Sequence, residues 1–155
     1  MSRDSHREIE RKFLVRELPH DLATFSHSAI EQGYLATAAD GVQVRLRKAG
    51  DQLSLTYKRD AKGGRIEREI AVTAAQFDVL WPATEDKRLT KTRYDVPLGN
   101  LVVEIDVYSG RHEGLVVAEV EFPSEEAARD FVPPAWLGED VSGSARYSNV
   151  RLACA

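Results

Sequence analysis

The sequence predicts a mainly β (α+β) fold, an eight-stranded antiparallel β-barrel or tunnel with a few flanking helices. Apolar and polar residues alternate with a period of two along most of the 155 residues, as in strands covered on one face. Clusters of Gly, Asp and Pro divide this alternation into eight segments. One face of the segments is charged almost throughout, and eight strands approach the number that can close into a barrel. Closure would turn the charged face inward.

The alternation gives the bounds of each expected strand. The hairpin joints at 39–41, 49–51 and 62–64 contain Gly, which tolerates the positive φ of tight turns. Neighbouring segments on either side of these joints should therefore pair antiparallel. In chain order, the expected strands are 7–15, 30–37, 42–48, 52–59, 65–72, 87–96, 100–108 and 115–122.

Helical signals are fewer. Thr73 is a suitable N-cap for a helix over 73–80, and Ser124, followed by two Glu residues, is a suitable N-cap for a helix that ends before Pro133. We expect helices at 73–80 and 124–131 and a short terminal helix over 145–154.

Size and composition indicate a single domain over residues 1–155. A mass of 17.3 kDa is near the modal domain size, and the net charge of −4 argues against a general electrostatic interaction with nucleic acid. The longest apolar run has four residues, far below the ~20 of a spanning helix, and residues 1–13 lack the apolar core of a signal peptide. We therefore expect a cytoplasmic location, with neither a nucleic acid nor a membrane as partner.

The charged face is the most informative feature for function. It could be the solvated side of an antiparallel sheet. However, its acids and bases are segregated by strand, and a closed barrel would bury them at a cost that ligands would offset. Carboxylates suit Mg²⁺ or Mn²⁺, and Arg and Lys suit phosphate oxygens, so the face predicts a site for a metal-bound polyphosphate. The acids are Glu8, Glu10, Glu67, Glu69, Glu104, Asp106, Glu119 and Glu121, and the bases are Lys12, Arg45, Arg47, Lys58, Arg65, Lys91 and Arg93.

The same residues carry a resemblance to a known family. Residues 8–12 read Glu-Ile-Glu-Arg-Lys, which matches the ExExK signature of the CYTH superfamily, the triphosphate tunnel metalloenzymes. The resemblance extends to Asn149 through an ordered series of motifs. These are EIERKFLV, QGYL (32–35), VRLRK (44–48), LTYK (55–58), RIEREI (65–70), KTRY (91–94), EIDVY (104–108), AEVEF (118–122) and RYSN (146–149).

The resemblance implies a tunnel that hydrolyses triphosphates with Mg²⁺ or Mn²⁺, and the short bacterial members act chiefly on inorganic tripolyphosphate. It implies metal ligation by Glu8, Glu10 and Glu121, with Glu104, Asp106 and Glu119 contributing directly or through water. Phosphate oxygens would contact Lys12, Arg45, Arg47, Lys58, Arg65, Lys91 and Arg93. Catalytic roles would fall to Lys12 and Tyr34, and to Glu67 and Glu69, which could hold a second ion or orient water. Ala145 departs from the family pattern, in which a basic residue is common.

Two other functions remain open at this stage. The chain could be a nucleoside or thiamine triphosphatase, or a class IV adenylyl cyclase, of the same superfamily, although the sequence carries no clear mark of a pocket for the organic part. It could also be a polyphosphate-binding module without catalysis. For the hydrolase we expect in-line attack of water on a terminal phosphorus of a small polyphosphate. Exposed strand edges would also be compatible with a homodimer.

Overall fold

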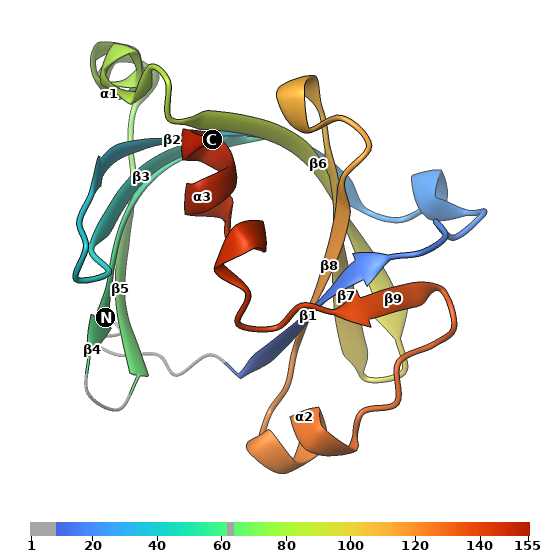
Figure 1. Ribbon diagram of the computed structural model, residues 1–155. Coiled ribbons are helices and arrows are strands. Elements are labelled where there is room, and N and C mark those ends of the chain that lie inside the picture. The colour runs from blue at the N-terminus through green and yellow to red at the C-terminus, as the bar shows by residue number, and fades with distance from the viewer. Residues whose placement is uncertain (1–8, 62–63) are drawn as a thin grey trace. The chain divides into compact units, whose positions relative to one another are not determined.

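A computed structural model describes residues 9–61 and 64–155 of the chain. The described residues form nine strands, three short α-helices and four 3₁₀ segments (Figure 1). The strands are β1 Glu10–Val15, β2 His27–Thr37, β3 Gln43–Ala49, β4 Gln52–Ala61, β5 Gly64–Ala71, β6 Arg88–Leu98, β7 Leu101–Tyr108, β8 Val116–Glu121 and β9 Leu137–Asp140. The α-helices are α1 Ala74–Leu80, α2 Glu125–Asp130 and α3 Asn149–Cys154, and the 3₁₀ segments are Leu22–Thr24, Trp81–Thr84, Gly110–His112 and Ala145–Tyr147. The prediction of a mainly β, antiparallel fold is confirmed.

The chain forms two compact units. The first unit contains residues 29–90 and 148–155, in which the strand order is β5-β4-β3-β2. Gly41 and Gly50, in the predicted hairpin joints, have φ values of +89° and +58°, while residues 62 and 63 of the third joint lie outside the described residues. Leu46 is fully buried in this unit.

Helix α1 begins at the predicted cap. The Thr73 hydroxyl accepts a hydrogen bond from the Gln76 backbone N–H at 3.1 Å, and the Gln76 side chain accepts one from the Thr73 N–H at 2.9 Å. Phe77 is buried and stacks on Trp81 with ring centroids 5.1 Å apart. This capping box determines where helix α1 begins, while the apolar face of the helix determines how the helix packs.

The second unit contains residues 9–28 and 91–147, with strand order β6-β7-β8-β1-β9. Its core takes alternate residues of these strands, as the period of two predicts. Ser124 caps α2 by accepting a hydrogen bond from the Ala127 N–H at 3.1 Å. The core residues are Phe13, Val96, Val103, Ile105, Ala118, Val120, Phe122 and Leu137.

Two features of the chain differ from the sequence prediction. Strand β9 was not expected, because four residues are too few to display an alternation. It pairs with β1. The two strands approach closely at Gly138, where a Cβ would lie 2.9 Å from the Leu14 carbonyl oxygen. The tail is also not one helix over 145–154. Ser148 is extended (φ −70°, ψ 144°) and caps α3, so the tail consists of a 3₁₀ segment followed by a helix.

None of the helices in the described part of the chain has both the length and the apolar character needed to cross a membrane.

Candidate functional site

The first unit brings predicted site residues together in rows that cross its strands. Tyr34 on β2 lies opposite Arg45 on β3, which lies opposite Thr56 on β4, which lies opposite Glu69 on β5. Gln32 and Arg47 form a second row on β2 and β3. Directly opposed residues share one face of a sheet and lie close together. We call the set Gln32, Tyr34, Arg45, Arg47, Thr56 and Glu69 the first cluster.

Arg45 is the buried cation of the first cluster. Its Nη2 donates to the Thr56 hydroxyl at 3.4 Å, and that hydroxyl donates to Glu69 Oε1 at 2.6 Å. Arg45 is only 7% exposed, and its Nε is buried without a hydrogen-bond partner in the described part of the chain. An unsatisfied buried N–H group is costly, so this atom is suited to meet an anionic ligand.

Arg47 is held by a neutral partner. Its Nε and Nη2 donate to the side-chain oxygen of Gln32 at 3.0 and 2.7 Å, and Gln32 is fully buried. The Gln32 amide also makes a long contact of 3.5 Å with the Tyr34 hydroxyl. Burial raises the pKa of Tyr34 above 10 despite the opposing effect of Arg45 and Arg47. Tyr34 is therefore a neutral phenol near pH 7, able to donate a hydrogen bond but unsuited to act as a base.

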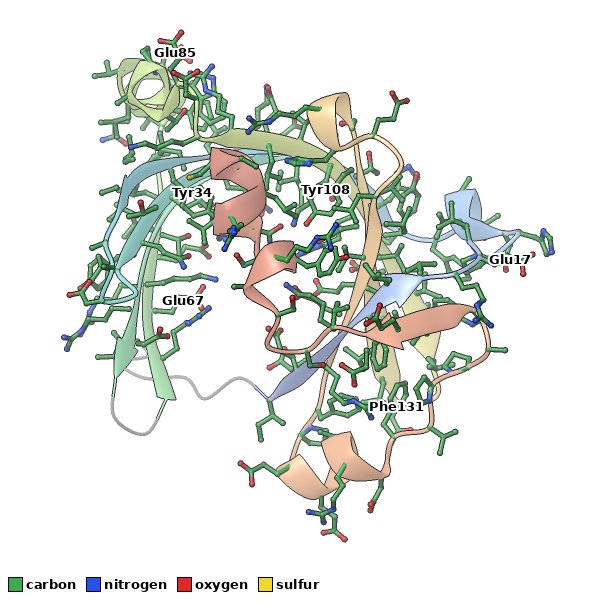
Figure 2. The ribbon with its side chains drawn as sticks, viewed as in Figure 1. Glu17, Tyr34, Glu67, Glu85, Tyr108 and Phe131 are labelled. Carbon is green, nitrogen blue, oxygen red and sulfur yellow. The ribbon has the colours of Figure 1, made fainter. Side chains whose placement is uncertain are left out.

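Two further ion pairs lie on the same face. Lys58 Nζ is 3.9 Å from Glu67 Oε1, and Arg65 Nε is 3.3 Å from Asp60 Oδ1. Lys58 and Glu67 are largely shielded from solvent, whereas the side chains of Arg65 and Asp60 are 41% and 64% exposed. Figure 2 labels Tyr34 and Glu67 on this part of the molecule. Arg65 is thus the most solvated of the predicted bases in this unit.

The second unit contains a ladder of carboxylates, which consists of Asp95, Glu104, Glu119, Glu10 and Glu121. Asp95, Glu104 and Glu119 lie opposite one another on β6, β7 and β8, and Glu119 also lies opposite Lys12 on β1. Glu10 lies opposite Glu121. Like charges directly opposite each other destabilise a sheet unless something compensates them. We call the set Glu10, Lys12, Lys91, Arg93, Asp95, Glu104, Asp106, Glu119 and Glu121 the second cluster.

Asp106 is committed to two cations of the second cluster. It accepts from Lys91 Nζ at 2.8 Å and from Nε and Nη2 of Arg93 at 2.8 and 2.9 Å. The Lys91 side chain is fully buried, and its Nζ lies 5.5 Å from the Tyr108 ring centroid. Burial alone would raise the pKa of Asp106, but Lys91 and Arg93 hold it below its ordinary value. Ion pairs thus occupy a carboxylate that the family resemblance assigned to the metal.

Two further cations of this unit contact the ladder. Lys12 Nζ lies 3.2 Å from Glu119 Oε1 and donates to the Tyr147 carbonyl at 3.2 Å. Arg93 Nη1 lies 3.3 Å from Glu104 Oε2. The cluster contains six carboxylates and three cationic side chains, so carboxylates outnumber cations within this set.

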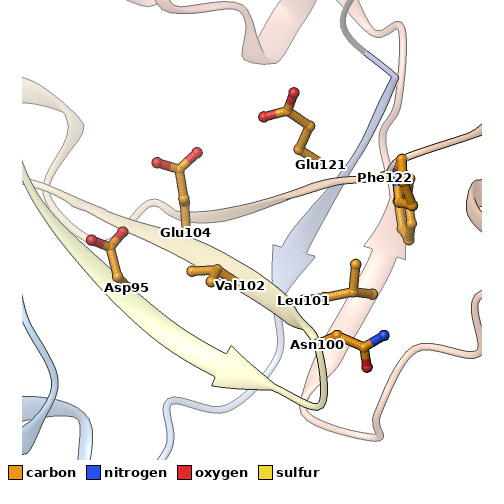
Figure 3. Close-up of a pocket in the computed structure, with 8 residues that line it drawn as sticks. Asp95, Asn100, Leu101, Val102, Glu104, Glu121 and Phe122 are labelled. Carbon is orange, nitrogen blue, oxygen red and sulfur yellow. The ribbon is translucent and has the colours of Figure 1, made fainter.

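A pocket of about 700 Å³ opens beside the ladder. Figure 3 shows the carboxylates of Asp95, Glu104 and Glu121 projecting to the same side from neighbouring strands. Burial and repulsion from Glu119, Asp106 and Asp95 raise the pKa of Glu104, although Arg93 opposes the shift. The residues that line the pocket are Asp95, Asn100, Leu101, Val102, Glu104, Glu121, Phe122 and Pro123.

The donor set of the ladder fits Mg²⁺ or Mn²⁺. Opposed carboxylate oxygens are hard ligands, and a divalent cation would relieve the repulsion that, after burial, raises the pKa of Glu104. Within the ranges the structure describes, no three His, Cys, Asp or Glu side chains converge tightly enough to form a complete ion site. Mg²⁺ is commonly held by one or two carboxylates together with substrate phosphates, so a pair such as Glu10 and Glu121 would be sufficient.

Replacing Glu104 with Gln is expected to raise the melting temperature of the metal-free protein at pH 7. The pKa of Glu104 is raised in the folded state, so ionising Glu104 costs more free energy in the folded protein than in the unfolded chain. This cost is fully present above the folded-state pKa and disappears below about pH 4.5, the unfolded value. Thermal unfolding in EDTA at pH 7 and pH 4 measures both limits. A variant that melts below the wild type at pH 7 would contradict the repulsion described here.

The structure divides the predicted residues between the two units. Tyr34, Arg45, Arg47, Lys58, Arg65, Glu67 and Glu69 lie in the first, while Glu10, Lys12, Lys91, Arg93, Glu104, Asp106, Glu119 and Glu121 lie in the second. Glu8 lies outside the described residues. Gln32, Thr56 and Asp95 were not predicted to have roles. The alternation places Gln32 on the face of Tyr34 and Asp95 on the face of Arg93, a signal that could have identified both.

Comparisons with known proteins extend over nearly the whole chain. The sequence profile of the CYTH domain matches residues 6–150. An inorganic triphosphatase of Nitrosomonas europaea is 45% identical over 148 residues, which cover 94% of this chain and 96% of that relative. An inorganic triphosphatase of Acetivibrio thermocellus is 34% identical over 149 residues, covering 94% and 92%. The crystal structure of an inorganic triphosphatase gives a TM-score of 0.77 at 41% identity, covering 98% of this chain and 97% of the other.

Proposed function

The chain belongs to the CYTH domain family, and on this basis we propose that it is a metal-dependent hydrolase that cleaves inorganic tripolyphosphate to pyrophosphate and phosphate. The observation that carries the proposal is the 45% identity, over almost the full length of both chains, to a relative named inorganic triphosphatase. The two charged clusters support it independently, because one suits phosphate and the other suits a divalent cation.

The bases bind and neutralise the phosphate chain. Arg45 and Arg47 present planar guanidinium groups, which match phosphate oxygens in bidentate geometry, and Lys58 adds a point charge. Phosphoryl transfer depends mainly on positioning and on stabilising charge at the non-bridging oxygens. In the second cluster, Lys12 and Arg93 serve the same purpose, while Asp106 positions Lys91 and Arg93.

The carboxylates hold the ion and orient water. Glu10 and Glu121 bind Mg²⁺ or Mn²⁺, and Glu104 and Glu119 contribute directly or through water. A bound divalent ion would neutralise phosphate charge and lower the pKa of water. Glu67 and Glu69 orient the attacking water in line with the leaving pyrophosphate, and the neutral hydroxyl of Tyr34 donates a hydrogen bond to the substrate.

Phosphate release from a panel of substrates tests this function. Tripolyphosphate, ATP, thiamine triphosphate and pyrophosphate are each incubated with Mg²⁺, Mn²⁺ or EDTA, and initial rates are measured with a dye for phosphate. We expect rapid release from tripolyphosphate with a divalent ion and none in EDTA. Faster release from ATP or thiamine triphosphate would favour the nucleotide-directed or thiamine-directed alternative. Binding of tripolyphosphate without release would identify a binding module.

A further inference from the structure

We propose that Thr56 is a positioning residue for Glu69: its buried hydroxyl donates a short hydrogen bond to the carboxylate and so fixes the direction in which Glu69 holds the attacking water. The inference rests on the proposed function, because it takes Glu69 to orient that water. It concerns a neutral side chain, for which the charge pattern predicted no role.

The place of Thr56 in the sheet explains how it holds the carboxylate. Thr56 lies on β4, directly opposite Arg45 on β3 and Glu69 on β5. It is fully buried, and a β-branched side chain in a strand has few χ1 rotamers, so its hydroxyl has a fixed position. The hydroxyl oxygen lies 2.6 Å from Glu69 Oε1, a distance typical of a hydroxyl that donates to an ionised carboxylate. Thr56 therefore anchors one oxygen of Glu69 to the sheet.

The partners of Thr56 set the direction of its two hydrogen bonds. The guanidinium group of Arg45 can only donate, and an ionised carboxylate can only accept. The single hydroxyl proton of Thr56 is therefore directed to Glu69, and the hydroxyl oxygen accepts from Arg45 Nη2. The contact with Arg45 is long, at 3.4 Å, and hence much weaker than the bond of 2.6 Å. Thr56 thus acts mainly on Glu69.

The two ends of this short hydrogen bond differ in exposure. Thr56 is fully buried, whereas Glu69 is exposed and can contact water. An exposed glutamate without an anchor would lose rotamer freedom each time it orients a water molecule. Because the hydroxyl restricts the carboxylate before the substrate arrives, part of this entropy cost does not enter the barrier of the reaction.

A comparison with Glu67 shows what the hydroxyl adds. Glu67 lies two residues before Glu69 on β5, opposite Lys58, and its Oε1 is 3.9 Å from Lys58 Nζ. An ammonium group on a flexible stem attracts a carboxylate at this distance without fixing its orientation. The bond from Thr56 is shorter and comes from a rigid side chain. Of these two contacts, only the one from Thr56 defines the direction of a carboxylate.

The test is to replace Thr56 with Val, which keeps the branched shape and removes the hydroxyl. We expect kcat for tripolyphosphate to fall about tenfold or more, while KM changes by less than about threefold, because the lost bond acts on the group that orients water. Thr56→Ser, which keeps the hydroxyl, should recover most of the wild-type kcat. Thr37→Val is the matched control: Thr37 is exposed on β2 in the same unit, belongs to neither cluster, and should leave both constants unchanged.

A cycle with Glu69 separates positioning from general disturbance. In a Glu69→Ala background, Thr56→Val should lower kcat no further, since its effect acts through Glu69. If Thr56→Val does not fold, Thr56→Ser and Thr56→Ala supply the test, because both lose the methyl group and only the second loses the hydroxyl; their kcat values should differ about tenfold. A kcat within twofold of wild type for folded Thr56→Val, or an equal loss with and without Glu69, would overturn the proposal. So would a rise in KM at unchanged kcat, because Thr56 would then act through Arg45.

NMR relaxation of the Glu69 side-chain methylene carbons measures the positioning without substrate or metal. Their order parameters should fall in Thr56→Val and stay at the wild-type level in Thr56→Ser and Thr37→Val. Unchanged order in Thr56→Val would overturn the proposal.

These outcomes are separable from those of the proposed function. A wild type that releases no phosphate from any triphosphate of the panel would refute the triphosphatase, and the order of Glu69 would then decide whether Thr56 positions it. Hydrolysis by the wild type, with unchanged order and kcat in Thr56→Val, would refute the role of Thr56 alone.

Discussion

Replacing Glu10 with Gln is expected to lower kcat for tripolyphosphate by at least about 100-fold at saturating Mg²⁺, because loss of a metal-binding carboxylate removes several kcal/mol of transition-state stabilisation. Glu10 lies opposite Glu121 in the ladder, and an amide is a weaker ligand than a carboxylate. The change also removes one like-charged pair, so the melting temperature should not fall. Initial rates over a range of Mg²⁺ concentrations, with thermal unfolding in parallel, measure both effects.

Glu17 provides the control for this change. It is an exposed glutamate in the same unit and belongs to neither cluster, so Glu17→Gln should retain the wild-type rate. A Glu10→Gln variant that turns over at the wild-type rate in saturating Mg²⁺ would remove Glu10 from the proposed metal site.

Replacing Asp106 with Asn is expected to destabilise the fold by about 3 kcal/mol at pH 7, the scale of breaking a buried ion pair by removing one partner. The buried Lys91 would lose its charge partner, and Arg93 would lose a bidentate one. The pKa of Asp106 is lowered in the folded state, so this stabilisation is present above its unfolded value of about 3.8 and is lost as the pH falls through the folded-state pKa. Urea unfolding at pH 7 measures the difference.

A second substitution distinguishes lost charge compensation from a general packing defect. Replacing Lys91 with Met in the Asp106→Asn background removes the buried cation that has lost the Asp106 carboxylate, so most of the lost stability should return. An Asp106→Asn variant with the wild-type urea midpoint would show that the buried ion pairs do not stabilise the second unit.

Local pattern was sufficient to predict the strands and the polar face. The period of two places Arg45 and Arg47 on one face of β3 and Leu46, which is buried, on the opposite face. This assignment requires no knowledge of the partner strands. Thr73 and Ser124 could also be identified as helix caps from local sequence, because capping depends on residues only three positions apart.

Strand register could not be predicted from local pattern. That Arg93 lies opposite Asp106, and Glu10 opposite Glu121, depends on pairing between segments distant in sequence. The metal role predicted for Asp106 came from resemblance, whereas its ion pairs appear only once the register is known. Gln32 was missed because a neutral amide carries no charge, although it is fully buried and accepts two hydrogen bonds from Arg47.

The most direct measurement follows tripolyphosphate itself by phosphorus NMR in the presence of the purified protein. We expect its signals to be replaced by those of pyrophosphate and phosphate in equal amounts with Mg²⁺, or with Mn²⁺ when the paramagnetic ion is removed on a chelating resin before the spectrum is recorded, and we expect EDTA to stop the conversion. Tripolyphosphate that stays intact with either ion, or is cleaved equally fast in EDTA, would contradict it.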